Sequence, residues 1–489
     1  MKKRAAYYFL VGVMLILSMS TTAYSCKKHE RDTTPINPID TTKDTTALKR
    51  DVEVWMTRPD KSALLRHQVI ALTFDTIVNS YPDIEVDTTR TYQAIDGFGF
   101  AMTGGSAYLI NRLQSDQREA LIRELFSSDS GCIGISYIRV SIGASDLSAT
   151  VFSYDDIPSG TTDTTLSSFT LAKEQEDLIP VLKTALKYNP QLKILGSPWS
   201  APTWMKTNGN SIGGKLKTEY YGVYSRYFVK YIQGMKSEGI PIDAITIQNE
   251  PLNPNNNPSM EMSSAEQGNF IKNYLGPAFQ DANITTKIIL YDHNCDHPEY
   301  PINILNDLNT RQYVDGSGFH LYAGDISALT QTHFAHPDKN VYFTEQWVGG
   351  PSNFGPDMQW HMKNLIIGAT RNWSKNVIEW NLASDPYYKP HTPGGCNSCE
   401  GALTIASSVA RNVSYYIIAH ASKFVFSGSK RIASSYPANL PNVAFKRPDG
   451  KKVLIVLNES SSTQSFNIKY GRKSAKTKLD KGVVATYIW

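Results

Sequence analysis

The sequence predicts an α/β fold: a (β/α)8 TIM barrel with a side β-sandwich domain built from N- and C-terminal segments. From about residue 95, eight short β-rich runs alternate with longer helical patterns. Both flanks of this region instead hold strand-like runs separated by turn signals. The chain has 489 residues, which is too long for one ordinary domain and suits a barrel with a smaller module.

The barrel region, 95–415, contains eight strand candidates with helical periodicity between them. The helical patterns at 115–126, 174–188 and 219–239 carry apolar residues at helical spacing, which favours core packing over ligand binding. The strand candidates are 97–101, 136–141, 193–196, 244–248, 287–291, 316–320, 340–344 and 376–380.

The two flanks, 50–94 and 416–489, read as antiparallel strands. Candidates lie at 52–56 and 69–74 before the barrel, and at 443–445, 452–457, 465–469 and 483–488 after it. We expect both chain ends to combine into one sandwich beside the barrel.

Residues 1–25 resemble a bacterial lipoprotein signal peptide. A basic head, Lys2 to Arg4, precedes an apolar core at 5–17 that is too short to span a bilayer comfortably. Small residues lead to Cys26, which we expect to be lipidated; the alternative is a plain secretory signal beside a free cysteine. Residues 26–49 are polar, so we expect a flexible tether. These features imply an exported lipoprotein of a Gram-negative bacterium, held on either face of the outer membrane by its lipid anchor only.

Charge and motif content narrow the classes of partner. The formal net charge is +4, and three of these charges fall within residues 1–25, so the remaining chain carries only +1. A near-neutral body argues against nucleic acid. The sequence shows no metal-ligand cluster and no phosphate-binding glycine loop with a lysine. We therefore predict no metal and no cofactor, and we expect a monomer.

Cys396 and Cys399 form a Cys-x-x-Cys pair in a glycine-rich stretch. Such a pair could be redox-active or supply half a zinc site, but the chain has no second pair to complete that site. In an exported protein, a local disulfide that stiffens a loop is the favoured interpretation.

Two glutamates lie directly after, or two residues beyond, the ends of strand candidates. Glu250 lies in the sequence QNEP after the fourth candidate, and Glu345 follows the seventh. Catalytic groups of a TIM barrel lie at the C-terminal ends of its strands, so the fold would bring these two together. Two facing carboxylates suit glycoside hydrolysis, and the anion of one raises the pKa of its partner. The alternative is that each acid only caps a helix or pairs with an arginine.

The chain resembles glycoside hydrolase family 30, which includes glucosylceramidases and β-1,6-glucanases. The matching stretches are IDGFG (95–99), YIRVSIGASD (137–146), SPWSAPTWMKTNG (197–209), QNEP (248–251), FTE (343–345), EWNL (379–382) and HASKF (420–424). The resemblance implies a barrel with a side β-domain made from both chain ends. It also implies a retaining mechanism with Glu250 as acid/base and Glu345 as nucleophile.

The resemblance further implies substrate-binding roles for seven residues. We expect Arg139 to lie beside the nucleophile and keep it ionised, Asn249 to bond the sugar 2-hydroxyl, and Tyr322 to donate to the nucleophile. The remaining four are expected to bind sugar hydroxyls, wall the subsite or line the site: Asp146, Trp199, His320 and Trp380.

The substrate expected from the resemblance is a β-glucan. The paired-cysteine insert after the eighth strand resembles subfamily 3, the endo-β-1,6-glucanases, which favours pustulan or a fungal cell-wall β-1,6-glucan. A glucosylceramidase or exo-β-glucosidase of the same family is the alternative. A tethered protein that binds glycan without catalysis is the alternative of another class, but it would not need both carboxylates.

Overall fold

The computed structural model describes residues 50–489. The predicted signal peptide, the predicted tether and Cys26 lie outside the described residues. Within 50–489, no helix is both long and apolar enough to cross a membrane.

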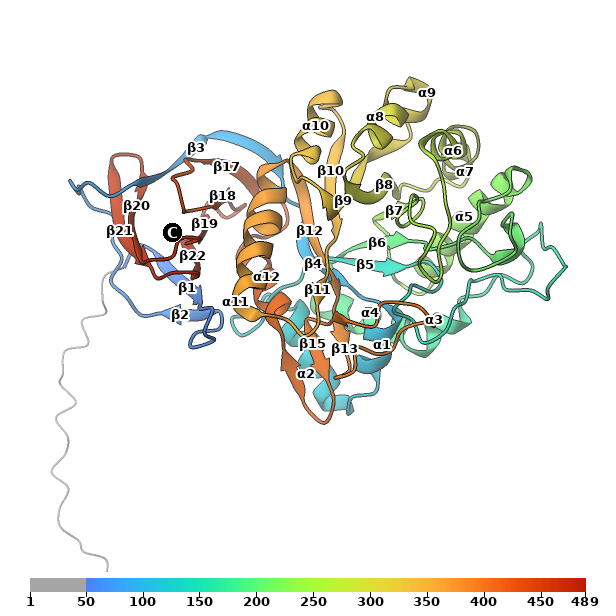
Figure 1. The fold of residues 1–489 in the computed structure, drawn as a ribbon, viewed down its shortest axis with the longest axis horizontal. Helices are drawn as coiled ribbons and strands as arrows, with labels where there is room; N and C mark the ends of the chain where they lie inside the picture. The colour runs from blue at the N-terminus through green and yellow to red at the C-terminus, as the bar shows by residue number, and fades with distance from the viewer. Residues whose placement is uncertain (1–49) are drawn as a thin grey trace, which may run out of the picture. The chain divides into compact units, whose positions relative to one another are not determined.

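Eight parallel strands close into a barrel at the centre of Figure 1. Each predicted barrel strand coincides with an observed one, which confirms the predicted fold class. In barrel order the strands are β4 (Gly97–Ala101), β5 (Tyr137–Ser141), β6 (Lys193–Ser197), β7 (Ala244–Thr246), β8 (Lys287–Cys295), β9 (Val314–Gly324), β10 (Asn340–Glu345) and β12 (Ser374–Asn381).

Alternation along the strands divides their apolar side chains between two cores. One set, which includes Tyr137, Leu195 and Tyr342, forms a cluster contributed by six of the eight barrel strands. Their chain neighbours, such as Ile138 and Ile194, belong to the large core shared with the helices. Because both faces are buried, these strands are almost continuously apolar, as parallel strands usually are.

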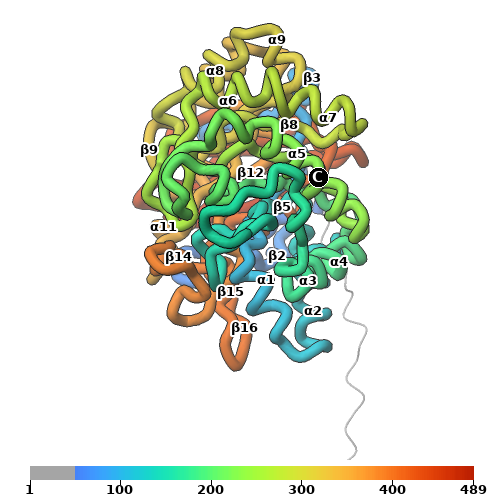
Figure 2. Tube along the Cα trace, turned by 90° about the vertical axis from the view of Figure 1, so that its right-hand side faces the viewer, coloured from blue at the N-terminus to red at the C-terminus, as the bar shows by residue number. Residues whose placement is uncertain are grey.

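Helices surround the barrel, and in Figure 2 α4 to α8 lie around β5 and β12. The predicted helix at 174–188 is broken at Asp177, whose backbone leaves the helical region with φ −136° and ψ −54°. The helices are α1 (Gly104–Asn111), α2 (Ser115–Phe126), α3 (Ala172–Glu176), α4 (Leu178–Tyr188), α5 (Tyr221–Ser237), α6 (Ser264–Phe270), α7 (Gly276–Asp281), α8 (Glu299–Leu305), α9 (Leu308–Arg311), α10 (Ala328–Ala335), α11 (Phe354–His361) and α12 (Val413–Ser422), with short 3-10 segments η1 (Thr203–Met205) and η2 (Thr218–Tyr220) and π-helical segments η3 (Ile271–Leu275) and η4 (Met362–Ala369).

The side domain is one hydrogen-bonded sheet that folds over on itself. Phe466 and Tyr487 lie on strands that are distant in the sheet order, yet their ring centroids are 6.2 Å apart in a common core. Both chain ends contribute, as predicted. The sheet order is β2 (Arg66–Gln68), β1 (Glu53–Thr57), β22 (Val484–Ile488), β19 (Lys452–Leu457), β18 (Asn442–Lys446), β17 (Lys430–Ser434), β3 (Asp83–Ala94), β20 (Gln464–Tyr470) and β21 (Lys473–Leu479).

One flanking strand prediction is wrong. Residues 69–74 form no strand: Val69 is 72% exposed, and apolar composition without alternate burial does not make a strand. The N-terminal strand that joins the interior of the sheet, between β17 and β20, is β3, whose polar sequence hides the alternation of buried Ile84 and Val86. The C-terminal strands β17 and β21 were likewise not predicted.

Helix α12 joins the barrel to the sandwich. In Figure 1, α11 and α12 lie between the barrel strands and the sandwich strands, and α12 packs against both β4 and β22. Buried His420 bonds Thr486 through Nδ1 at 2.9 Å and Thr57 through Nε2 at 2.8 Å. One helix residue therefore ties together both chain ends.

Short strands also lie in the loops at the C-terminal end of the barrel. β11 (Val348–Gly349) pairs with β14 (Cys399–Glu400), and β13 (Ala383–Ser384), β15 (Leu403–Ile405) and β16 (Val409–Arg411) form a separate small sheet. These segments fix the loops that follow β10 and β12, where the site is built.

Candidate active site

The two glutamates meet at one end of the barrel. Counted from β4, β7 is the fourth strand and β10 the seventh. Glu345 is the last residue of β10, and Glu250 follows β7 by four residues. This is the C-terminal end of the strands, where TIM barrels carry their catalytic groups.

The spacing of the two carboxylates fits a retaining glycosidase. One oxygen of Glu250, one oxygen of Glu345 and a ring nitrogen of His320 all lie within 4.8 Å of one another. Retaining enzymes hold their carboxyl groups about 5–5.5 Å apart, whereas inverting enzymes need about 6.5–9.5 Å to admit water between them. The separation leaves room for a sugar carbon to be attacked directly by one carboxylate.

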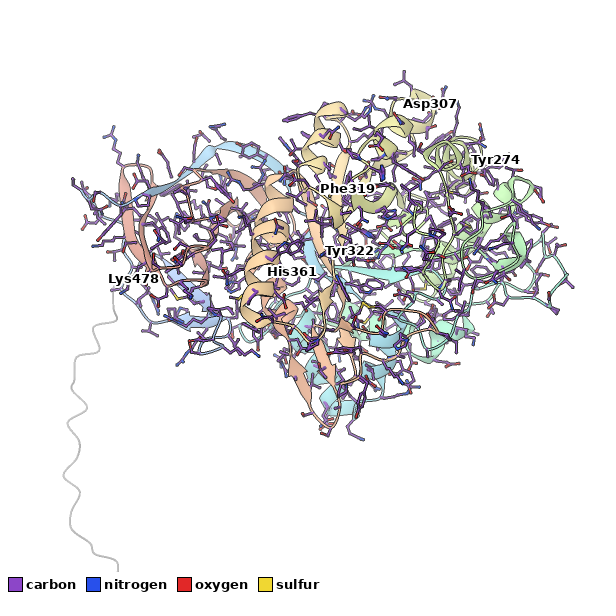
Figure 3. The ribbon with its side chains drawn as sticks, viewed as in Figure 1. Tyr274, Asp307, Phe319, Tyr322, His361 and Lys478 are labelled. Carbon is purple, nitrogen blue, oxygen red and sulfur yellow. A yellow bond between two sulfur atoms is a disulfide. The ribbon has the colours of Figure 1, made fainter. Side chains whose placement is uncertain are left out.

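Donors surround Glu345. The Arg139 guanidinium donates from Nη1 to Oε2, and the Tyr322 hydroxyl donates to Oε1 at 2.9 Å. Arg139 is fully buried in the middle of β5, and Tyr322 lies on β9, near the middle of the molecule in Figure 3. Both residues lie beside Glu345, the position that the resemblance implies for them. Charge-assisted donors of this kind favour a carboxylate anion.

Glu250 has a different set of neighbours. Its Oε2 accepts a hydrogen bond from Asn253 Nδ2 at 2.8 Å, and its Oε1 lies 3.3 Å from His320 Nδ1. His320 is fully buried, and its Nδ1 also lies 3.8 Å from Glu345 Oε1. The imidazole therefore stands between the two carboxylates.

The pKa values of the two carboxyls fall in the opposite order to the one that a protonated acid at Glu250 and an ionised nucleophile at Glu345 would require. Burial alone would raise the pKa of Glu250, but the hydrogen bond and positive charge of His320 outweigh it and bring that pKa to about 2. Burial raises the pKa of Glu345, although the charges of His320 and Arg139 oppose the rise. Arg139 therefore acts in the expected direction without determining the outcome.

His320 explains this order. Burial would lower its pKa, but the charge of Glu345, together with the hydrogen bonds to Asp292 and Glu250, raises it to about 9. At neutral pH the proton shared by His320 and Glu250 consequently resides on the imidazole. A general acid at Glu250 needs that proton, and the imidazole can deliver it across one hydrogen bond.

Two tryptophans wall the pocket. Trp199 and Trp380 stack with ring centroids 5.3 Å apart at 28°, and the Arg139 guanidinium lies 4.7 Å from the centre of the Trp199 ring. Asn249 accepts from Arg139 Nη2 at 2.7 Å through its Oδ1, so its amide nitrogen is the group available to a sugar hydroxyl. The pocket, of about 270 Å³, is lined by Asp146, Trp199, Glu250, Asn253, Asn256, Tyr322, Glu345, Trp347, Trp380, Cys396 and Cys399.

The cysteine loop closes the pocket beside Asp146. Cys396 and Cys399 are joined by a disulfide, and the Cys396 backbone N–H donates to Asp146 Oδ2 at 3.3 Å. Gly395 passes so close that a Cβ atom there would lie 2.4 Å from the Asp146 carbonyl oxygen. Burial, followed by the charge of Glu345, raises the pKa of Asp146 to about 7. Asp146 can therefore donate or accept toward a sugar hydroxyl near neutral pH.

All nine predicted catalytic and substrate-binding residues lie in or directly behind this pocket. Sequence reasoning missed five further residues that line it or contact its members: Asn253, Asn256, Asp292, His293 and Trp347. Asp292, His293 and Trp347 follow a predicted barrel strand by one to three residues, so a signal for these three existed. Asn253 and Asn256 lie five and eight residues beyond the predicted fourth strand, too far along a loop for the strand end to indicate them.

His293 is a neutral structural member of this group. Its Nδ1 accepts the Leu252 backbone N–H at 3.3 Å, which holds the loop that carries Glu250. Burial lowers the pKa of His293 to about 4, so it is uncharged at neutral pH. The positive charge near the carboxylates therefore comes from Arg139 and His320.

Comparison with family models covers nearly the whole described body. The model described as the glycosyl hydrolase family 30 TIM-barrel domain matches residues 95–425, and the family's β-sandwich domain matches residues 428–487. These ranges agree with the barrel and with the C-terminal part of the sandwich.

Similar proteins include both an endo-β-1,6-glucanase and a glucosylceramidase. The chain is 36% identical over 405 residues to an endo-1,6-β-D-glucanase of Aspergillus fumigatus, covering 77% of this chain and 81% of the relative. It is 29% identical over 435 residues to the lysosomal acid glucosylceramidase of Mus musculus, covering 82% of each chain.

A solved structure matches at the level of the whole fold. The endo-β-1,6-glucanase BT3312 superposes with a TM-score of 0.85 and 33% identity, covering 90% of this chain and 99% of that protein. The extent of the family match, together with the carboxylate pair at the ends of strands four and seven, establishes that the chain belongs to glycoside hydrolase family 30.

Proposed function

We propose that the protein is a retaining endo-β-1,6-glucanase that cleaves pustulan-like or fungal cell-wall β-1,6-glucan with Glu250 and Glu345. The observation that carries the mechanism is the approach of the two carboxylates to within 4.8 Å. The linkage is supported by two relatives named as endo-1,6-β-glucanases, at 36% and 33% identity.

In the first step, a carboxylate oxygen of Glu345 attacks the anomeric carbon of the bound glucose. The bond from that carbon to the O6 atom of the next glucose breaks, and O6 takes a proton from Glu250. That proton is the shared one: His320 Nδ1 passes it to Glu250 across their 3.3 Å contact before O6 takes it, which leaves Glu250 ionised. The step leaves a covalent glycosyl ester, a neutral imidazole and a shortened glucan.

Ester formation and proton delivery are coupled through charge. The Glu345 anion is the largest influence that raises the pKa of His320. Once Glu345 is esterified that anion is gone, so the imidazolium gives up its proton more readily. Attack by Glu345 thus makes the His320 proton more readily available to Glu250, which protonates the leaving O6.

In the second step, water attacks the anomeric carbon and Glu345 departs as a carboxylate. Glu250 takes the water's proton, which the His320 pair then stores again. Two inversions at one carbon give net retention of the β configuration. The charge on Glu345 returns as the bond to the anomeric carbon breaks, and the donors Arg139 and Tyr322 stabilise it.

The pocket residues hold the sugar during both steps. Trp199 and Trp380 offer an apolar wall to the ring, which is how aromatic side chains commonly meet sugars. Asn249 presents its amide nitrogen to the 2-hydroxyl, a contact that strengthens in the oxocarbenium-like transition state. Asp146 binds a hydroxyl farther from the cleaved bond, beside the disulfide loop.

Product analysis with linear β-1,6-glucan tests the linkage and the mode of cleavage. Early release of a ladder of oligosaccharides supports the endo-glucanase. Release of glucose alone keeps the linkage and makes the protein an exo-β-glucosidase. Glucosylceramide is the control substrate, because relatives named as glucosylceramidases reach 30% identity. Turnover of that lipid with no turnover of the glucan overturns the proposal, and binding of glucan without turnover of either favours the non-catalytic alternative.

We also propose that Cys26 is lipidated and that the protein is a monomer on the outer membrane of a Gram-negative bacterium. The support is the basic and apolar pattern before Cys26 and the polar stretch after it. Replacing Cys26 with Ala is expected to abolish incorporation of labelled palmitate. Labelling that persists in the variant contradicts the anchor.

A further inference from the structure

Asp292 lies behind the catalytic pair, out of reach of the sugar. It belongs to β8, the fifth barrel strand, its side chain is fully buried, and it does not line the pocket. It therefore makes no contact with a bound glucan. Neither the sequence nor the proposed mechanism gave it a role.

Both carboxylate oxygens of Asp292 are fully engaged. Oδ2 accepts from Arg139 Nη2 and from Thr246 Oγ1, each at 2.7 Å. Oδ1 accepts from Thr344 Oγ1 at 2.6 Å and from His320 Nε2 at 3.0 Å. The four donors come from β5, β7, β10 and β9, so one side chain links four other strands of the barrel.

Two of these donors are the groups that touch the catalytic carboxylates. Arg139 donates to Asp292 and also to Glu345, while His320 contacts Asp292 through Nε2 and Glu250 through Nδ1. Each of the two catalytic residues is therefore one group removed from the same carboxylate. A shift of Asp292 would move both.

The backbone makes a third connection. The Glu250 N–H donates to the Asp292 carbonyl oxygen at 3.0 Å. Both residues hold positive φ angles, 45° for Glu250 and 63° for Asp292, as does Tyr291 at 70°. Non-glycine residues enter this left-handed region at a cost and do so preferentially at functional sites. Two strained segments are thus joined directly behind the pocket.

Asp292 also determines which nitrogen of His320 faces Glu250. Because Nε2 is bonded to a carboxylate, it carries a proton in both charge states of the ring. Nδ1 can then donate to an ionised Glu250 or accept from a protonated one. This is the arrangement that the shared proton requires.

We propose that Asp292 is the positioning residue of the active site: it orients Arg139 toward the nucleophile and His320 toward the acid/base, and thereby sets both their spacing and the location of the shared proton. The expected effect of Asp292 on turnover rests on the proposed function. The effect of Asp292 on His320 is a property of the chain itself and can be measured without any substrate.

The test is Asp292→Asn in the full chain, assayed on linear β-1,6-glucan. The amide has the size of the carboxylate, but its NH2 group meets a donor where an acceptor is required. We expect kcat to fall by about 100-fold, as for a misplacement of catalytic groups by about 1 Å, while KM stays near the wild-type value because Asp292 does not touch sugar.

A second readout is the titration of the His320 ring followed by NMR, with the signal assigned by its loss in His320→Asn. Removing the Asp292 anion is expected to lower the pH at which this ring loses its proton, and with it the alkaline limb of the activity profile. The other charged or titratable groups that face the ring stay in place: Arg139, Glu250, His293, Tyr322 and Glu345.

Glu174→Gln is the matched control. Glu174 is another buried carboxylate, bonded by the Tyr154 hydroxyl at 2.8 Å on α3, outside the pocket. This variant is expected to keep the wild-type kcat, pH profile and His320 titration. It separates loss of a buried carboxylate from loss of this particular one.

The outcomes are distinct. A wild-type kcat and an unchanged His320 titration in Asp292→Asn overturn the proposal. If the wild type cleaves no glucan but His320 titrates lower in the variant, the positioning role stands and the proposed function fails. If Asp292→Asn does not fold, Thr344→Val removes one donor from Oδ1 and leaves the charge. A fall in its kcat with unchanged KM then supports the proposal, and an unchanged kcat overturns it.

Discussion

At the level of single residues, the two glutamates proposed as catalytic have different neighbours. Glu345 receives donors from Arg139 and Tyr322, which suits an anion that must attack carbon. Glu250 shares a proton with His320, which suits a group that must give and take one. The division of labour follows from these neighbours rather than from the intrinsic chemistry of glutamate.

Glu345→Gln is expected to reduce kcat on β-1,6-glucan by on the order of 10⁴-fold or more, because the amide cannot form the glycosyl ester. Glucan binding should persist, since the walls formed by Trp199 and Trp380 are untouched. Turnover and calorimetric binding on the same preparation measure both effects. An active variant would remove Glu345 as the nucleophile.

The pH profile of kcat/KM is expected to be bell-shaped. Glu345 must be ionised, and burial raises its pKa. The acid limb of the profile should therefore lie at a higher pH than an ordinary glutamate would give. The proton held by His320 and Glu250 is lost as pH rises through about 9, which gives the alkaline limb. His320→Asn should move that limb to lower pH, and an unmoved limb would show that His320 does not store the proton.

At the scale of elements, the loop at residues 392–399 connects three parts of the catalytic face. Thr392 donates to the Asp146 carbonyl oxygen from its backbone N–H at 2.8 Å and to the Asn257 carbonyl oxygen from Oγ1 at 2.5 Å. At its other end, the Gly350 N–H donates to the Ser398 carbonyl oxygen at 2.7 Å. The loop thus holds the segments that follow β5, β7 and β10.

Replacing Cys396 and Cys399 together by Ser is expected to lower activity far more than stability. The bridge closes a loop of only four residues, so its chain-entropy contribution to the free energy of unfolding is about 2 kcal/mol. Both cysteines nevertheless line the pocket, and the Cys396 backbone contacts Asp146. We expect kcat/KM to fall for short β-1,6-gluco-oligosaccharides as well as for long glucan. An effect confined to long glucan would place the loop's role outside the pocket.

Not every element could be predicted from the sequence. The eight barrel strands were, because burial on both faces gives compact apolar runs between helical patterns. Strand β3 was not, since its buried Ile84 and Val86 stand among acids, threonines and an arginine. Likewise, the polar residues after the predicted fifth strand, 287–291, indicate a site, but no local pattern shows that Asp292 contacts other strands and not the sugar.

At the scale of the whole molecule, hydrogen bonds between residues far apart in the sequence join the sandwich to the barrel. His420 on α12 bonds threonines that are 363 and 66 residues away in the chain. The order of the two catalytic pKa values has the same origin, because it depends on His320 from β9 standing between residues that follow β7 and end β10. Such long-range effects are beyond local sequence patterns.

The protein is expected to lose stability as pH falls below about 6.5, the ordinary value for histidine. Burial lowers the pKa of His420 to about 3, so between these values the unfolded chain binds a proton that the folded chain does not. His420→Gln removes this proton uptake and should flatten the dependence of the free energy of unfolding on pH. Urea denaturation at pH 7 and pH 5 measures it. His297→Gln, at a half-exposed position, is the control, and an equal slope in both variants would contradict the role of His420.

Proton NMR of the reducing ends released from linear β-1,6-glucan in the first minutes of reaction shows whether the pair of glutamates cleaves with retention. Because the carboxylate oxygens lie within 4.8 Å of one another, we expect the β anomer to appear first and the α anomer only later, as mutarotation proceeds. If the α anomer appears first, the enzyme inverts, and if no new reducing ends appear, this pair does not cleave the glucan.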